Sequence, residues 1–174
     1  LFYAPPRPLI ERYLRLEVTE RLDARGEVIT PLNEDEARQI IEQLKAEGVD
    51  GVAICFLHAY ANPDHEIRMA QLVQEVFPEA HVTISSEICQ EWREFERTST
   101  TVLNVYTKPK MANYLSALSQ ELDKRRYTGT LNIMQSSGGI TSLLAAQVGP
   151  IRTVMSGPAG GVIGASAIGK MIEQ

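Results

Sequence analysis

The 174-residue sequence is poor in cysteine, has no surplus of basic residues and contains no long apolar run. Its two cysteines, Cys55 and Cys89, stand far apart among apolar, strand-like residues. This spacing fits no zinc-binding pattern and indicates reduced core thiols of a cytoplasmic protein. A net charge of −5 offers no basic surface to phosphates, so nucleic-acid binding is not expected. The longest uncharged apolar stretch, Gly51 to Leu57, is too short to cross a membrane.

The sequence also lacks an initiating methionine and begins with Leu1. Residues 1–8 are rich in proline and are expected to be extended. They contain neither the charged region nor the apolar region of a signal peptide. We therefore expect a processed product or a piece of a longer protein.

Hydrophobic residues make up 44% of the chain, enough for a substantial core. Residues 14–22 alternate between apolar and polar, a glycine-containing turn follows at 23–26, and a second extended run covers 27–32. This pattern predicts an antiparallel hairpin. Asn33 with Glu36 three residues later is typical of a helix start, and Gly48 of a helix end.

The next segments alternate between helix and strand patterns. The continuous apolar run 52–57 predicts a strand buried on both faces, as in a parallel sheet. Asn62 and Pro63 predict the cap and the first turn of a helix, and residues 81–86 predict another strand. We therefore predict an α/β class with a layered, mixed or parallel sheet and flanking helices over 33–174. Residues 1–32 form an extended segment and hairpin that belong to the same compact unit.

The remaining elements are less regular. Residues 101–106 fit either strand or helix, and Pro109 is expected to begin a helix. A strand is predicted at 130–135, a short helix at 141–148, another strand at 151–155, and a final helix from Pro158.

The run from Ser156 to Gly161 has the form of a strand–turn–helix junction, where backbone amides can face an anion. One interpretation is a nucleotide or anion site, and the other is close packing of a glycine-rich helix. The adjoining Gly164 to Lys170 resembles a P-loop, but Met171 stands where a magnesium-binding hydroxyl is required. The candidate binding residues in this run are Ser156, Gly157, Gly160 and Gly161.

Two further polar segments are candidates. The turn Ser136, Ser137, Gly138 and Gly139 either lines a cleft or is only a tight turn. Glu96, Arg97 and Thr98 either belong to a site or form a solvated face with helix capping. His58 and His65 are interpreted as loop and capping residues rather than metal ligands. No catalytic residue and no metal ligand can be assigned.

Five ordered segments carry a wider resemblance. In sequence they are GVAICFLHAYANPDHE, SSEI, EFERTSTTVLN, MQSSGG and RTVMSGPAGGVIGA, beginning at residues 51, 85, 94, 134 and 152. Together they resemble the hydantoinase A / 5-oxoprolinase family, which includes N-methylhydantoinase A-like proteins and acetone and acetophenone carboxylase subunits.

This resemblance implies part of an actin/Hsp70-like (ribonuclease-H-like, ASKHA-type) ATPase lobe. It also implies ATP-dependent opening of a cyclic amide such as a hydantoin or 5-oxoproline. ATP would phosphorylate the amide oxygen, and water would then attack the activated carbon. A partner subunit of hydantoinase B type is implied as well.

One feature departs from the family pattern. Neither Gly-Gly pair of the chain has the preceding acid and following threonine of an Asp-x-Gly-Gly-Thr phosphate loop. We therefore expect ATP and Mg to bind the full-length protein, no cofactor to bind this piece, and the piece alone to be inactive. A segment of an ATP-dependent ketone carboxylase subunit and a non-catalytic α/β binding module remain alternatives.

Overall fold

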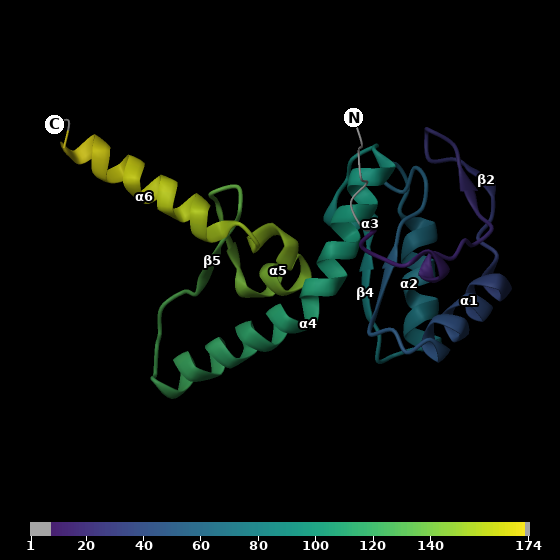
Figure 1. Cartoon of the computed structure of the whole chain (residues 1–174), viewed down its shortest axis with the longest axis horizontal. Helices are drawn as coiled ribbons and strands as arrows, with labels where there is room; N and C mark the ends of the chain where they lie inside the picture. Colours follow the sequence, from purple (N-terminus) through teal and green to yellow (C-terminus); the bar gives the residue numbers. More distant parts are fainter. Residues whose placement is uncertain (1–7, 173–174) are drawn as a thin grey trace, which may run out of the picture. The chain divides into compact units, whose positions relative to one another are not determined.

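A computed structural model describes residues 8–172 (Figure 1). Of the predicted extended segment 1–8, all but Pro8 lies outside the described residues. The chain divides into two compact units, 1–106 and 107–174. The predicted grouping of 1–32 with 33–174 in a single unit stays a prediction.

The first unit contains a hairpin, a parallel strand pair and four helices, the last of which continues beyond it. In chain order its elements are η1 (Arg12–Leu14), β1 (Arg21–Leu22), β2 (Val28–Thr30), α1 (Glu34–Ala46), β3 (Gly51–Ile54), α2 (Asp64–Val76), β4 (His81–Ile84), α3 (Ser85–Ile88) and the start of α4 (Glu94–Lys124). The mixed α/β class predicted from the sequence is confirmed.

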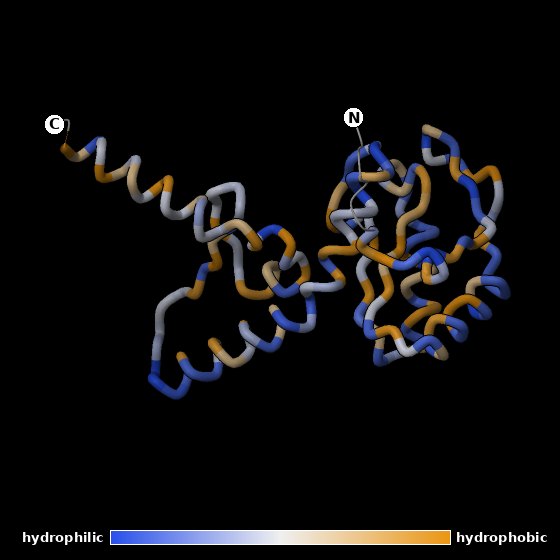
Figure 2. Tube along the Cα trace, in the orientation of Figure 1, coloured by the Kyte–Doolittle hydropathy of each residue, from blue (hydrophilic) through white to orange (hydrophobic). Residues whose placement is uncertain are grey.

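The centre of this unit is a β-α-β arrangement. β3 and β4 pair in parallel, in a register that sets Gly51 opposite His81 and Ile54 opposite Ile84, and α2 connects them. Figure 2 shows hydrophobic residues along these strands. The predicted parallel pairing is therefore confirmed, with strands shorter than the runs 52–57 and 81–86.

The two faces of the strand pair meet different helices. Val52 and Ile54 belong to the core cluster formed with residues of α1 and α2. On the other face, Asn104 of α4 donates from Nδ2 to Thr83 Oγ1 at 3.3 Å. A Cβ on Gly51 would lie 2.8 Å from Val105 Cγ2, so glycine is what allows α4 to approach β3 so closely.

Local signals set the ends of α1. The Asn33 side chain accepts a hydrogen bond from Glu36 N, and Gly48 adopts φ +72° just after the helix, as predicted. The Glu36 carboxylate does not accept the reciprocal hydrogen bond from Asn33 N that completes a capping box. It accepts a hydrogen bond from Thr19 N at 2.7 Å and so fastens the segment before the hairpin to α1.

The N-terminal hairpin is confirmed, although its strands are short. β1 and β2 pair antiparallel around a turn in which Gly26 adopts φ +85°. Asn62 Nδ2 donates to Gly26 O at 2.9 Å, and Leu22 is buried. Asn62 also accepts from Asp64 N, and α2 begins at Asp64, one residue later than predicted.

The helix α4 contains residues 101–106, which the sequence left open between strand and helix, and Pro109, which was expected to begin a helix. Residues 101–106 are helical, and Thr101 Oγ1 donates to Arg97 O one turn earlier, a bond that suits a helix. Pro109 does not begin a helix but lies inside the 31 residues of α4. A proline removes one backbone donor from a helix, and here the turns on both sides continue.

The second unit contains, after the remainder of α4, the strands β5 (Asn132–Met134) and β6 (Ile140–Ser142) and the helices α5 (Leu143–Val148), η2 (Pro150–Thr153) and α6 (Ser156–Ile172). The strand predicted at 151–155 is wrong, because Pro150 opens a 3-10 turn there. Thr153 Oγ1 closes that turn by donating to Pro150 O at 2.8 Å. β5 pairs instead with β6, which the sequence analysis missed, and α6 begins at Ser156 rather than Pro158.

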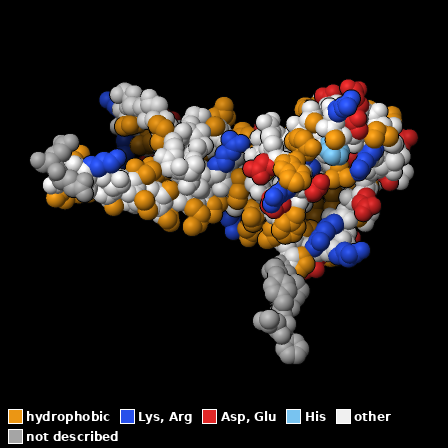
Figure 3. Space-filling model, turned by 90° about the horizontal axis from the view of Figure 1, so that it is seen from above, with side chains coloured by type: hydrophobic (Ala, Val, Ile, Leu, Met, Phe, Trp, Pro, Cys, Tyr) orange, Lys and Arg blue, Asp and Glu red, His pale blue; other side chains and the backbone are white. Residues whose placement is uncertain are grey.

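The helix α6 exposes large apolar side chains along its length, including Val162, Ile168, Met171 and Ile172. Figure 3 shows apolar side chains towards the free end of this helix. Within residues 8–172 no helix is long and apolar enough to cross a membrane.

Candidate functional site

A buried polar cluster lies just past the carboxyl ends of β3 and β4. We call it the Glu66–Arg97 cluster, and it consists of the Phe56 backbone and the residues Glu66, Ser85, Ser86 and Arg97. Ligand sites of α/β folds commonly form beyond the carboxyl ends of parallel strands. The cluster therefore stands where such a fold would place a site.

Glu66 of α2 is completely buried and accepts three hydrogen bonds. Its Oε1 accepts from Phe56 N at 2.9 Å and from Ser85 Oγ at 2.5 Å, and its Oε2 accepts from Ser86 N at 2.8 Å. One carboxylate thus joins the two chain segments where the ladder between β3 and β4 ends. Such a buried carboxylate is tolerated because donors surround it.

Arg97 of α4 is the largest of the fully buried side chains, with 1% of its surface exposed. Its Nη2 donates to Phe56 O at 2.6 Å. Nε and Nη1 are buried without a hydrogen-bond partner among the described residues. The ring of Tyr60 lies over the guanidinium, 5.7 Å from centroid to Cζ, in a cation–π arrangement.

The thiol of Cys55 borders this cluster. Burial raises the pKa of Cys55, and hydrogen bonding to Thr101 opposes that shift only in part. Cys55 is half-buried, and a thiol with a raised pKa is a poor nucleophile. The interpretation of Cys55 as a core cysteine fits this environment.

The loop between β3 and α2 carries backbone strain. His58 adopts φ +61°, a conformation rare for a residue with a side chain. Its Nδ1 lies 3.2 Å from Tyr60 Oη, so the strained residue contacts the ring that covers Arg97. Strain of this kind is often found at functional sites.

His65 is paired with a carboxylate from another segment. His65 Nδ1 lies 2.7 Å from Glu20 Oε2 in a nearly buried pair that joins α2 to the segment before β1. Across residues 8–172, no group of three or more His, Cys, Asp or Glu side chains is arranged to hold a metal ion.

In the second unit, the structure brings together the two glycine-containing segments that the sequence singled out. Ser136 Oγ accepts a hydrogen bond from Met155 N at 3.0 Å, next to the first residue of α6, and Ser136 N donates to Arg152 O at 2.7 Å. Gly138 adopts φ +87° in the turn, where a Cβ would lie 2.8 Å from Ile163 Cδ1 of α6. The turn and α6 are therefore packed against each other.

The glycines of α6 differ in their surroundings. A Cβ on Gly160 would lie 2.8 Å from Met134 Sδ of β5, so this glycine permits close packing. A Cβ on Gly157 or Gly161 would have no described atom within 4 Å. Close packing of the helix therefore rests on Gly160.

The remaining predicted residues lie in several environments. Ser137, Gly139 and Thr98 are exposed, while Ser156 is half-buried. Glu96 is also exposed and forms an ion pair with Arg93 at 3.6 Å. Of the predicted trio at 96–98, only Arg97 is buried.

Sequence analysis missed the functional candidates Glu66, Ser85 and Ser86. Glu66 was given no role in the predicted helix, and the two serines were placed at the end of the predicted strand 81–86. All three fall within segments that carry the family resemblance, which was the available signal for them.

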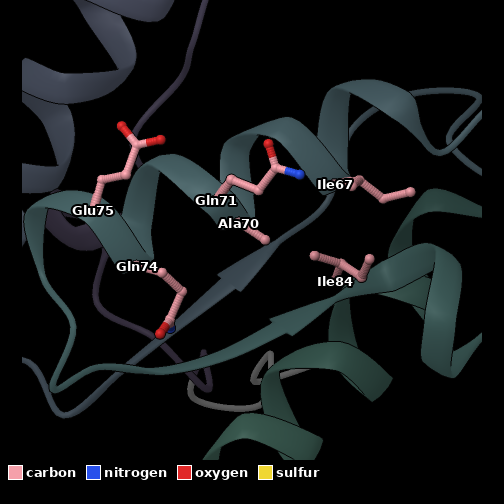
Figure 4. A pocket seen from close by; sticks show the side chains of 6 residues that line it. All are labelled: Ile67, Ala70, Gln71, Gln74, Glu75 and Ile84. Atoms are coloured by element: carbon pink, nitrogen blue, oxygen red, sulfur yellow. The ribbon is translucent and has the colours of Figure 1, made fainter.

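A separate groove of about 510 Å³ runs beside α2 (Figure 4). Its lining is mainly apolar and comes from one side of α2 and the last residue of β4, namely Ile67, Ala70, Gln71, Gln74, Glu75 and Ile84. The one carboxylate among these residues, Glu75, is paired with Arg38 at 2.6 Å and Arg68 at 3.4 Å. The groove offers few groups for specific chemistry.

Comparison with protein families identifies two matches, which are separated by residues 78–96. Residues 1–77 match the hydantoinase/oxoprolinase N-terminal region, and residues 97–174 match the hydantoinase/oxoprolinase model. An uncharacterized protein of Methanocaldococcus jannaschii is 42% identical over 99% of this chain and 25% of its own length.

Two solved structures are also similar. The nucleotide-free structure of an acetone carboxylase, from work on ATP-dependent acetone carboxylation, matches with a TM-score of 0.90 and 34% identity over 99% of this chain and 24% of its own. The ATP-dependent caprolactamase of Pseudomonas jessenii matches with a TM-score of 0.82 and 30% identity over 90% of this chain and 23% of its own. The chain spans about a quarter of the length of these relatives. Both family models and both structures thus agree with the resemblance read from the motifs, and the chain belongs to the hydantoinase/oxoprolinase family.

Proposed function

We propose that the chain is part of an ATP-dependent enzyme that opens cyclic amides, such as a hydantoin or 5-oxoproline. The observation that carries this proposal is the similarity to an ATP-dependent caprolactamase over 90% of the chain. The two matches to hydantoinase/oxoprolinase models support the same reaction class. The whole enzyme would act in the cytoplasm together with a partner subunit of hydantoinase B type.

Within that enzyme, the chain would supply part of an actin-like, ribonuclease-H-like ATPase lobe. The turn at residues 136–139 and the start of α6 would line one wall of the nucleotide cleft. The bonds from Ser136 to Met155 and Arg152 support this assignment, because they hold the turn and the helix start in a fixed arrangement. Arg97 and its neighbours Glu96 and Thr98 are the candidates in the first unit.

The turn does not by itself fit the phosphates of ATP. Ser136 N already donates to Arg152 O, and Gly138 N donates to Gln135 O at 3.0 Å. A phosphate cradle needs such amides free to face the anion. The phosphate loops and the magnesium site are therefore expected elsewhere in the full-length protein.

Calorimetry tests this division of roles. We would titrate ATP with Mg into the 174-residue chain and into a polypeptide extended to the length of the relatives. We expect tight binding only by the longer polypeptide, which would also open hydantoin or 5-oxoproline in the presence of ATP. Tight binding of ATP by the 174-residue chain would contradict the assignment of the phosphate loops.

A ketone carboxylase subunit is the second candidate, favoured by the TM-score of 0.90 to acetone carboxylase. The two candidates differ in what stimulates ATP hydrolysis. A cyclic amide would stimulate the hydrolase, whereas a ketone together with bicarbonate would stimulate the carboxylase. Steady-state ATP hydrolysis with each substrate set separates them.

A further inference from the structure

The guanidinium of Arg97 is buried and has hydrogen-bond donors that no described residue uses. Only 1% of the residue is exposed, one nitrogen donates to Phe56 O, and Nε and Nη1 have no partner among the described residues. A buried charged donor that stays unpaired is costly, typically about 1–3 kcal/mol or more. Folded proteins normally supply such a group with a partner.

Two glutamates of this region, Glu66 and Glu96, have other partners. Glu66 uses its oxygens for Phe56 N, Ser85 Oγ and Ser86 N. Glu96, next to Arg97 in sequence, is exposed and pairs with Arg93. None of the ion pairs found among residues 8–172 includes Arg97.

A second orphaned group belongs to the same hydrogen-bond network. Ser86 Oγ is buried and has no partner in the described structure, while Ser86 N donates to Glu66. Arg97 and Ser86 are linked through Glu66 and the Phe56 backbone. The guanidinium nitrogens can only donate, so a ligand that satisfies Arg97 must present acceptor atoms, and the Ser86 hydroxyl can either donate or accept.

We propose that Arg97 binds the oxyanion of a small molecule, either a carboxylate or a phosphate group. The planar guanidinium offers several N–H donors in a fixed fork that matches the oxygens of such groups. The site lies at the carboxyl ends of β3 and β4, where α/β folds place ligands. Because Arg97 is also a candidate residue of the proposed ATPase lobe, binding of a phosphate group here rests on the proposed function, whereas binding of a carboxylate does not.

The loop between β3 and α2 forms the cover of this site. The Tyr60 ring lies over the guanidinium, and His58, in its strained conformation, contacts the Tyr60 hydroxyl. Because Arg97 is almost completely buried and the Tyr60 ring lies over its guanidinium, we expect an anion to reach it when this loop moves. Binding is therefore expected to shift the Tyr60 ring signals together with those of Arg97.

The test is a titration of the complete 174-residue chain, labelled with ¹⁵N, at constant ionic strength. Sodium phosphate, sodium acetate and sodium chloride are added in separate arms, and the Arg97 Nε–H resonance is followed by NMR. We expect a saturable shift with phosphate or acetate, whichever the site prefers, and none with chloride. Equal shifts in all three arms, or no saturable shift in any, would overturn the proposal and leave bound water as the partner of the guanidinium.

Variants add a second measurement. Arg97→Lys keeps the charge but loses the fork, and we expect the dissociation constant to rise at least about tenfold. Arg93→Gln removes an exposed arginine of the same region, 62% exposed and paired with Glu96, and should bind within about twofold of the parent. Equal affinity of the Arg97→Lys variant and the parent would contradict the assignment. If the Arg97→Lys variant does not fold, the titration of the parent chain with phosphate, acetate and chloride still tests the proposal.

Discussion

Glu66 and Arg97 hold the same residue through its two backbone groups. Phe56 N donates to Glu66 Oε1 at 2.9 Å, and Phe56 O accepts from Arg97 Nη2 at 2.6 Å. Phe56 follows the last residue of β3 by two positions, where no ladder bond with β4 supports the chain. A carboxylate of α2 and a guanidinium of α4 thus fix the chain where it leaves the sheet.

The first prediction concerns the loss of the buried carboxylate. Glu66→Ala leaves Phe56 N, Ser85 Oγ and Ser86 N without an acceptor, so we expect the free energy of unfolding to fall by about 3–5 kcal/mol. Glu66→Gln keeps one acceptor oxygen and should lose less. Urea denaturation followed by circular dichroism measures both.

Glu75→Ala is the matched control for this prediction. Glu75 lies on the same helix but is 46% exposed in its ion pairs, and surface pairs contribute at most about 1 kcal/mol. A loss from Glu66→Ala no larger than the loss from Glu75→Ala would refute the structural role of the cluster.

The second prediction concerns Gly51. A Cβ there would lie 2.8 Å from Val105 Cγ2 and 3.1 Å from His81 O, and the backbone oxygen cannot easily move. We expect Gly51→Ala to lower the free energy of unfolding by about 1–3 kcal/mol. In contrast, Gly164→Ala places its methyl group where no described atom lies within 4 Å, and should be neutral or raise stability by up to about 1 kcal/mol. Equal effects of the two substitutions would show that α4 does not pack on β3 as described.

The third prediction concerns acid. The hydrogen bond from Thr19 N holds the pKa of Glu36 below its ordinary value of 4.5. The unfolded chain therefore binds a proton more readily than the folded one. The ionised Glu36 side chain therefore stabilises the folded state. This contribution is present above pH 4.5 and is lost as the pH falls through the lowered pKa.

We expect Glu36→Gln to reduce the decline of the urea midpoint between about pH 5 and pH 3. Glutamine can still accept the Thr19 bond but does not titrate, so it keeps the fastening and removes the pH dependence. An unchanged decline in the variant would assign the acid sensitivity to other carboxylates.

The fourth prediction concerns Cys55. Because burial raises the pKa of this thiol, it should react slowly with a maleimide at about pH 7.5 in the folded protein and rapidly in urea. A Cys89→Ser variant leaves Cys55 as the only thiol, and mass spectrometry follows the labelling. Labelling in the folded state as fast as in urea would show that the thiol is accessible.

The fifth prediction concerns the start of α6. Ser136→Ala removes the oxygen that accepts from Met155 N, and we expect faster hydrogen exchange at that amide and a loss of about 1 kcal/mol. Ser137→Ala changes an exposed neighbour and should leave the exchange rate unchanged. Indistinguishable exchange in the two variants would remove the structural link between the turn and α6.

Features with a local cause could be predicted from the sequence. Asn33 caps α1 and Gly48 ends it because each acts through its own backbone or that of residues nearby. The apolar run at 52–57 indicated a buried strand for the same reason. The order of helices and strands around β3 and β4 could therefore be predicted from these local signals.

Features with a distant cause could not be predicted. The burial of Glu66 depends on donors ten to twenty residues away, and its position on an amphipathic helix gives no sign of them. Residues 151–155 have the composition of a strand, but strand formation requires a pairing partner, and β5 pairs with β6 instead. Pro109 signals a helix start in isolation, and the long helix around it overrides that preference.

The carboxylate of Glu66 has a consequence for how the chain avoids mistakes as it folds. Its three donors stand together only when β3 and β4 align with Gly51 opposite His81. A pairing displaced by one residue would turn the apolar side chains to the wrong face and would also bury this charge with its donors out of reach. The apolar pattern does not oppose a displacement by two residues, which keeps each side chain on its face, so the donors that Glu66 needs add a cost to alignments that the pattern alone would tolerate.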